Sequence, residues 1–227
     1  MTVLVIQHEA DVPLGLLSEL LSSPRILRMW EDPLAVSEVL QWIDEGEPMP
    51  DSVLVLGGRQ NAYADEAWPW LSDVRELIRR CIDSDVRVLG VCLGAQLIAV
   101  AAGGKVEVGA AAGPEYGVTR ISWSDDFSAD PLVSGLRNTR WVFEDHGDAI
   151  ATLPAGGQVW ASSEKYPQVI SVGCAIGTQF HPEVTETIVR DWQADNADTD
   201  TEEIVAGFLA HRDELAQTCR VLAAWIH

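Results

Sequence analysis

A cysteine flanked by two glycines constrains this chain more than any other feature. Gly90 and Gly94 stand two residues before and two residues after Cys92, between an apolar run and a stretch of helical composition. This is the spacing of a nucleophile elbow, in which the reactive residue sits on a sharp turn from strand to helix. The neighbours must be small because helix and strand pass close together there, and the helix N-terminus favours a thiolate. A buried structural cysteine before a helix is the alternative interpretation.

The first hundred residues alternate between short apolar runs and amphipathic segments. Strands are predicted at 2–7, 25–30, 52–56 and 86–91, and helices at 14–21, 34–43, 68–82 and 93–102. This rhythm predicts βαβ units, so the fold class is α/β, with an open, mainly parallel central sheet and helices on both faces. Ligands gather at the carboxyl ends of such strands, where His8, the pair Gly57-Gly58 and Cys92 lie.

The second half has a different pattern. Short strands at 106–108, 117–123, 140–143, 158–162, 169–172 and 175–180 suggest antiparallel additions to the sheet. Helices are predicted at 185–192 and 204–226. The segment 191–203 holds six acidic and no basic residues, which favours a solvated loop. Without a repeat or a linker, residues 1–227 are expected to form a single domain.

Charge and cysteine usage narrow the functional classes. Acidic residues number 35 against 15 basic ones, and the net charge of −20 disfavours nucleic acid and anionic membranes as partners. The four cysteines have no metal-binding spacing, so we expect no metal and no cofactor. The N-terminus does not resemble a signal peptide, and no apolar run reaches the roughly 20 residues of a membrane span. A reducing, cytoplasmic location follows as an expectation.

A second motif supplies what a cysteine nucleophile needs. In the run Gln179-Phe-His-Pro-Glu-Val184, His181 and Glu183 are two residues apart and share a face of an extended chain. Pro182 favours an extended conformation at His181. The imidazole can take the thiol proton while the carboxylate orients the ring. A surface pair is the ordinary interpretation of an isolated His-x-Glu, but together with the elbow the motif predicts a Cys92–His181–Glu183 triad.

Three motifs in this order resemble the class I (triad) glutamine amidotransferases: Leu56-Gly-Gly58, Gly90-Val-Cys-Leu-Gly-Ala-Gln96 and Phe180-His-Pro-Glu183. The stretches Gly113–Gly117 and Asp145–Asp148 are more similar to stand-alone, GMP-synthase-like members. The resemblance implies the flavodoxin-like class I glutaminase fold and glutamine as substrate. It also implies that ammonia passes to an acceptor, which would be a separate synthetase subunit, since no phosphate-binding P-loop or dinucleotide fingerprint occurs in the chain.

The resemblance also implies roles for individual residues. Cys92 attacks the side-chain amide carbon of glutamine, backbone N–H groups of Gly58 and Leu93 hold the oxyanion, and His181 protonates the leaving ammonia. Glutamine is held by Gly57, Gln96, His146 and Gly147. From the residues themselves, Gln96 could equally serve packing, and His146 could only shape its loop.

One departure from the family pattern concerns the substrate. Many members continue the glycine pair with Pro-Gly, whereas here Arg59 follows. Arg59 could meet a substrate carboxylate or point to solvent, so a stand-alone γ-glutamyl peptidase or transferase is an alternative function. A catalytically silent binding module is a third.

Several other residues near the motifs are assigned structural roles. We expect His8 to be a satisfied loop histidine and Glu115 to lie outside the site. The remaining cysteines, at 81, 174 and 219, are expected to serve packing. Trp68 and Trp70 could border the pocket.

Overall fold

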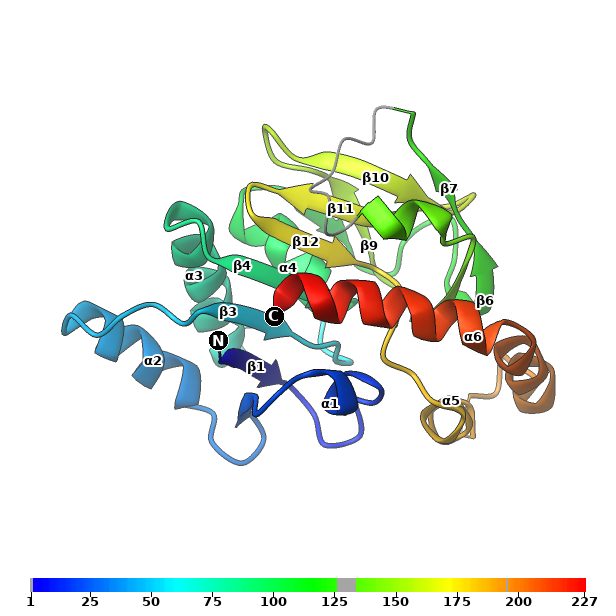
Figure 1. The fold of residues 1–227 in the computed structure, drawn as a ribbon, viewed down its shortest axis with the longest axis horizontal. Helices are drawn as coiled ribbons and strands as arrows, with labels where there is room; N and C mark the ends of the chain where they lie inside the picture. The colour runs from blue at the N-terminus through cyan, green and yellow to red at the C-terminus, as the bar shows by residue number, and fades with distance from the viewer. Residues whose placement is uncertain (1, 126–133, 195) are drawn as a thin grey trace.

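An eight-stranded sheet forms the centre of the computed structural model, which describes residues 2–125, 134–194 and 196–227 (Figure 1). In spatial order its strands are β2 (Arg25–Arg28), β1 (Val3–Gln7), β3 (Ser52–Val55), β4 (Arg87–Val91), β12 (Ala175–Thr178), β11 (Pro167–Val172), β10 (Gln158–Ser162) and β7 (Ser122–Trp123). The first five run parallel, and the last three continue antiparallel. The predicted α/β class with a mainly parallel sheet is confirmed.

Both faces of the sheet are buried, which explains the continuous apolar runs of its strands. In β1, Leu4 and Ile6 pack in one core while Val3 and Val5 pack in the other, because successive side chains point to opposite faces. The first core is covered by three helices, α2 (Ala35–Asp44), α3 (Trp70–Asp83) and α4 (Leu93–Ala101). The second is covered by α1 (Leu17–Leu20) and by the last turns of α6 (Thr201–Ile226), which crosses the front of the sheet in Figure 1.

The predicted helix at 14–21 is largely wrong, since only the four residues of α1 are helical. Gly15 has a φ of +50°, outside the right-handed helical region. A Cβ at this position would lie 2.0 Å from the carbonyl oxygen of Glu183, and Leu16 N–H donates to that same oxygen at 2.8 Å. The segment is thus used to hold the chain around Glu183 rather than to extend a helix.

The second half is only partly an antiparallel addition to the sheet. Strand β12 is parallel and lies beside β4 at the centre. Four other strands form two separate two-stranded sheets: β5 (Lys105–Glu107) with β9 (Ala149–Thr152), and β6 (Glu115–Arg120) with β8 (Trp141–His146). Strand β9 was not predicted, and a 3₁₀ turn occupies Ser134–Asn138. The alternation of apolar and polar residues along a strand indicates which face is buried, but it does not indicate which strand lies beside it. These pairings could therefore not be predicted from the sequence pattern.

The acidic segment 191–203 is a loop only in its middle part, and both of its ends are helical. Helix α5 (Glu186–Gln193) extends into it, and α6 begins at Thr201, with Asp200 accepting hydrogen bonds from the N–H groups of Glu202 and Glu203. Residue 195 lies outside the described residues. The acidic side chains at the start of α6 complement the positive end of the helix dipole, so an acidic run serves here as a helix start.

None of the helices in the described part of the chain combines the length and the apolar character that a bilayer crossing requires. The single-domain organisation of residues 1–227 stays a prediction.

Candidate active site

Cys92 occupies a sharp turn between β4 and α4. Its φ and ψ are +50° and −106°, an unfavourable conformation for a residue with a side chain, and the residue is 6% exposed. A Cβ at Gly90 would come within 2.5 Å of the Gly94 backbone, and one at Gly94 would lie 2.1 Å from the Val55 carbonyl oxygen. Both glycines are therefore required for the close passage of strand and helix, as the spacing predicts.

His181 and Glu183 follow β12 and are brought to the same place. His181 Nδ1 lies 2.8 Å from Glu183 Oε1, and both side chains are buried. The backbone N–H of His181 donates to the Phe143 carbonyl at 2.8 Å, which ties it to β8. Trp192 of α5 packs edge-on against the imidazole at 4.8 Å between ring centroids. Burial disfavours the charged ring, but the charges of Glu183 and Cys92 outweigh it and hold the pKa of His181 well above 6.5.

The glycine pair after β3 lies directly between these groups. A Cβ on Gly57 would approach His181 Cε1 to 2.9 Å and Cys92 Cβ to 3.6 Å. One on Gly58 would lie 3.1 Å from Leu93 Cδ2. The backbone at 57–58 thus runs beside the base, the sulfur and the first residue of α4. Leu93 N–H, in the first helical turn, has no intrahelical acceptor and is free to bind a ligand oxygen.

A pocket of about 300 Å³ opens over Cys92 and His181. It brings together six of the predicted residues: Gly58, Cys92, Gln96, His146, Gly147 and His181. Gly57, Leu93 and Glu183 do not line the pocket but contact or directly adjoin residues that do. Five lining residues were not predicted, namely Val12, Gln60, Tyr116, Asp145 and Trp192. Tyr116 and Asp145 stood in stretches that the sequence singled out; the other three come from loops and a helix whose approach to the pocket has no local signal.

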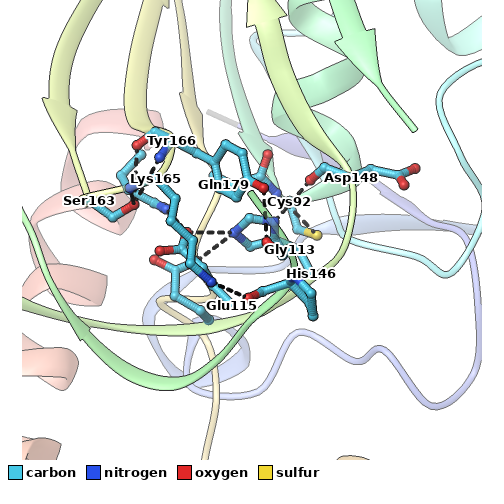
Figure 2. Close-up of polar contacts among 12 residues, drawn as sticks. Cys92, Gly113, Glu115, His146, Asp148, Ser163, Lys165, Tyr166 and Gln179 are labelled. Carbon is cyan, nitrogen blue, oxygen red and sulfur yellow. Dashed lines mark hydrogen bonds and ion pairs between the residues drawn. The ribbon is translucent and has the colours of Figure 1, made fainter. Parts of the chain in front are cut away.

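A hydrogen-bond network connects the pocket wall to the sulfur (Figure 2). Gln96 Nε2 donates to the Asp148 carbonyl at 3.1 Å and to Gln179 Oε1 at 3.3 Å. Gln179 Nε2 in turn donates to Cys92 Sγ at 3.7 Å. Both amide hydrogens of Gln96 are therefore bonded within the protein. Its side-chain carbonyl oxygen is the atom that remains for a ligand.

His146 is held by two carboxylates across the β6–β8 pair. Its register partner is Glu115, and Glu144 lies two residues earlier on the same face. His146 Nε2 lies 3.2 Å from Glu115 Oε2 and 3.3 Å from Glu144 Oε2, while Nδ1 lies 2.9 Å from the Asp148 carbonyl oxygen. Burial opposes the charge on this ring, but both carboxylates favour it and raise the pKa of His146 to about 10. Glu115, expected to lie outside the site, supports its wall.

Glu115, Glu144 and His146 are also the group in the described residues with the composition of a metal site, their ligand atoms lying within 4.8 Å of one another. Both nitrogens of His146 face acceptors, and a doubly protonated ring would form ion pairs with Glu115 and Glu144. The prediction of no metal and no cofactor stays a prediction.

Arg59 does not point freely to solvent. Its guanidinium lies 2.7 Å from Glu9 and 2.6 Å from Asp11, and Glu9 also accepts from Gln60 Nε2 at 2.7 Å. Arg59 lies at the pocket rim, but its charge is already matched by two carboxylates of the chain. A substrate carboxylate would have to share the guanidinium with them.

Trp68 and Trp70 are absent from the pocket lining. Trp70 Nε1 instead donates to His8 Nδ1 at 3.2 Å, and burial lowers the pKa of His8 to about 4. His8 is therefore a neutral, buried histidine beside the glycine loop, but it is only partly satisfied, because its Nε2 has no hydrogen-bond partner among the described residues.

A strained cysteine at a helix N-terminus, with a buried His–Glu pair and a glycine loop beside it, defines the class of thiol-dependent acyl-transfer proteins on an open α/β sheet. A sequence model of the family described as glutamine amidotransferase class-I matches residues 29–191, and the chain belongs to this family.

Individual relatives place the chain near GMP synthases. It is 41% identical over 105 residues to a glutamine-hydrolyzing GMP synthase subunit from Saccharolobus solfataricus, a match that covers 45% of this chain and 53% of that protein. A glutamine-hydrolyzing GMP synthase from Limosilactobacillus reuteri is 33% identical over 139 residues, which cover 60% of this chain and 25% of that protein. The matched part thus spans about half of the archaeal protein and a quarter of the bacterial one.

Solved structures agree over nearly the whole chain. A glutamine amidotransferase from Thermotoga maritima superposes with a TM-score of 0.78 at 26% identity, covering 99% of this chain and 96% of that one. A putative GMP synthase subunit from Thermoplasma acidophilum superposes with a TM-score of 0.60 at 25% identity, covering 94% and 98%.

Proposed function

We propose that this protein hydrolyses the side-chain amide of glutamine and supplies the ammonia to a separate synthetase subunit. The observation that carries the proposal is the buried His181–Glu183 pair, 2.8 Å apart, set against the Cys92 elbow. Family membership supports glutamine as the amide donor.

The proposed chemistry is acyl transfer through a thioester. The Cys92 thiolate attacks the amide carbon, and the oxyanion is received by backbone N–H groups of Gly58 and Leu93. One such preorganised donor contributes about 3–4 kcal/mol in comparable sites. His181 gives its proton to the departing ammonia and then takes one from the water that hydrolyses the thioester. Glu183 keeps the ring oriented and favours its charged form.

The substrate amino acid is proposed to lie along the wall formed by Gln96 and the 146–148 turn. Gln96 offers its carbonyl oxygen, since its amide hydrogens are bound to Asp148 and Gln179. His146 contributes through its hydrogen bond to the Asp148 carbonyl, which fixes the conformation of the turn and so positions the Gly147 backbone for ligand contact. The volume of about 300 Å³ is at the small end for ligand sites and suits an amino acid.

A separate synthetase partner is supported by the names of the archaeal relatives, which are subunits of glutamine-hydrolyzing GMP synthases. Ammonia released into bulk solvent would be diluted and lost. A docked acceptor subunit would instead consume the ammonia where it is formed.

The test measures ammonia and amine release from glutamine and from a panel of γ-glutamyl amides. Wild type is expected to convert glutamine to glutamate, and Cys92→Ser to lose at least about 1,000-fold in rate. Cys174→Ser is the matched control, because Cys174 donates to the Val86 carbonyl at 3.0 Å, far from the pocket, and a hydroxyl can do the same. Rapid turnover of γ-glutamyl amines with none of glutamine would replace the proposal with a γ-glutamyl hydrolase.

A further inference from the structure

The side chain of Gln179 has no role in the mechanism proposed above, although it touches the nucleophile. Gln179 directly follows β12 and is 1% exposed. Its Nε2 lies 3.7 Å from Cys92 Sγ, and Figure 2 shows the amide directed at the sulfur. Its backbone N–H donates to the Gln168 carbonyl at 2.9 Å, so the residue is held by the main chain of β11.

The neighbours of Gln179 decide which end of its amide faces the sulfur. The Asp148 carbonyl can only accept, so Gln96 must turn its NH₂ group toward it, at 3.1 Å. The second hydrogen of that NH₂ group is then directed to the nearby side-chain atom of Gln179, at 3.3 Å, which must be the oxygen. The NH₂ group of Gln179 is thereby left facing Cys92. A flipped Gln179 would set two NH₂ groups against each other.

This donor differs from the other groups around the sulfur. The imidazoles of His181 and His146 both interact electrostatically with Cys92. His181 has to release its proton to the leaving group, whereas an amide keeps its hydrogens throughout the reaction. Hydrogen bonds to a charged acceptor are stronger than bonds to a neutral one, so an N–H donor beside Sγ favours the thiolate over the thiol.

We propose that Gln179 is a catalytic residue whose side-chain amide donates to Cys92, stabilises its thiolate and fixes the direction of the sulfur. The inference rests on the proposed function in taking Cys92 as the nucleophile. The same bond acts twice. It supports the thiolate before the S–C bond forms, and again when water attacks the thioester and the S–C bond breaks, returning its electron pair to sulfur.

The test compares Gln179→Met, which keeps the shape and removes the donor, with Gln179→Glu, which sets a carboxylate against the thiolate. Thr178→Val is the matched control: Thr178 is the preceding residue, equally buried, and its hydroxyl has no hydrogen-bond partner among the described residues. The measurement is the rate of alkylation of Cys92 by iodoacetamide as a function of pH. Mass spectrometry of the Cys92 peptide separates it from the other three cysteines.

Alkylation of Gln179→Met at pH 7 is expected to be about 10-fold slower than in wild type, with the profile moved to higher pH. Gln179→Glu is expected to fall further, and Thr178→Val to overlay the wild type. A Gln179→Met profile identical to wild type overturns the proposal. If circular dichroism shows that Gln179→Met is unfolded, Gln179→Leu, which also lacks the donor, takes its place, and an unchanged profile there has the same meaning.

The outcome is separable from that of the proposed function. Alkylation needs no glutamine, so a shifted profile in a protein without glutaminase activity would reject the proposed function and keep the role of Gln179. Glutaminase activity together with an unshifted profile would keep the proposed function and reject the role of Gln179.

Discussion

At the scale of single residues, the charge on His181 is a balance between burial and two neighbours. Burial alone would keep the imidazole neutral, and Glu183 and Cys92 reverse this by their negative charge. The charged form of His181 therefore depends on both neighbours. In the proposed mechanism, Glu183 is thus expected to set the pH range of activity as well as the orientation of the ring.

Replacing Glu183 by Gln is expected to lower the rate of amide hydrolysis at least about 10-fold. The pKa of His181 should fall, because burial remains while the favourable charge is lost. The alkaline limb of the pH–rate profile should then move to lower pH, which a profile of glutamine hydrolysis checks. Glu186→Gln is the control, since that exposed carboxylate only pairs with Arg190. An alkaline limb that stays in place would contradict the assignment of Glu183.

At the scale of elements, the turn from β4 to α4 depends on glycine for steric reasons. The clash at Gly94 is with a backbone carbonyl of β3, which cannot move without breaking the sheet. Gly207 in α6 differs, since a Cβ there would find nothing closer than 3.9 Å.

Gly94→Ala and Gly207→Ala are therefore expected to change stability in opposite directions. Gly94→Ala should cost about 3 kcal/mol or more of the free energy of unfolding, or prevent folding. Gly207→Ala should add about 0.5–1 kcal/mol, because alanine favours the helix. Urea unfolding of both variants checks this, and a neutral Gly94→Ala would mean that the elbow is looser than described.

The strand pair β6–β8 is stabilised by protons as well as by its hydrogen bonds. The pKa of His146 is about 10 in the folded chain, against 6.5 for an ordinary histidine, and burial also raises the pKa of Glu144. Both shifts mean that the folded state binds more protons than the unfolded one. The His146 contribution is fully present below pH 6.5 and is lost as the pH rises through about 10.

The free energy of unfolding should consequently fall between about pH 7 and pH 10, and this fall should be smaller in His146→Gln. Urea unfolding at a series of pH values provides the measurement. Equal slopes in both proteins would show that the ring is not charged in the folded state.

At the scale of the whole molecule, the net charge of −20 opposes the compact state by self-repulsion. Surface ion pairs compensate only in part, since most are exposed. The melting temperature should rise by several degrees from about 0.01 M to about 1 M salt, as the screening length falls from about 30 Å to about 3 Å. Sodium and potassium chloride should act alike, and a melting temperature independent of salt would contradict this account.

The agreement between sequence and structure differs from one region to another for physical reasons. The parallel strands were predicted because β1 and β3 are buried on both faces and therefore consist of mostly apolar residues in sequence. The elbow, the glycine loop and the His-x-Glu pair were recognised because each depends on residues close together in the chain. The prediction of a helix at 14–21 was wrong because Gly15 packs closely against the backbone of Glu183, a residue far away in the chain. The loop predicted for the acidic run is shorter than expected, because its last residues cap and begin helix α6.

By itself, the sequence determined the α/β class and led to the proposed chemistry of Cys92 and of its expected base, since periodicity and local spacing carry that information. Only the tertiary structure decided the occupants of the pocket wall. It placed Glu115 and Glu144 around His146, tied Arg59 to Glu9 and Asp11, and turned the amide of Gln179 toward the sulfur. These contacts join strands and loops that are distant in the chain, and a buried polar atom takes whichever partner the packing brings within reach.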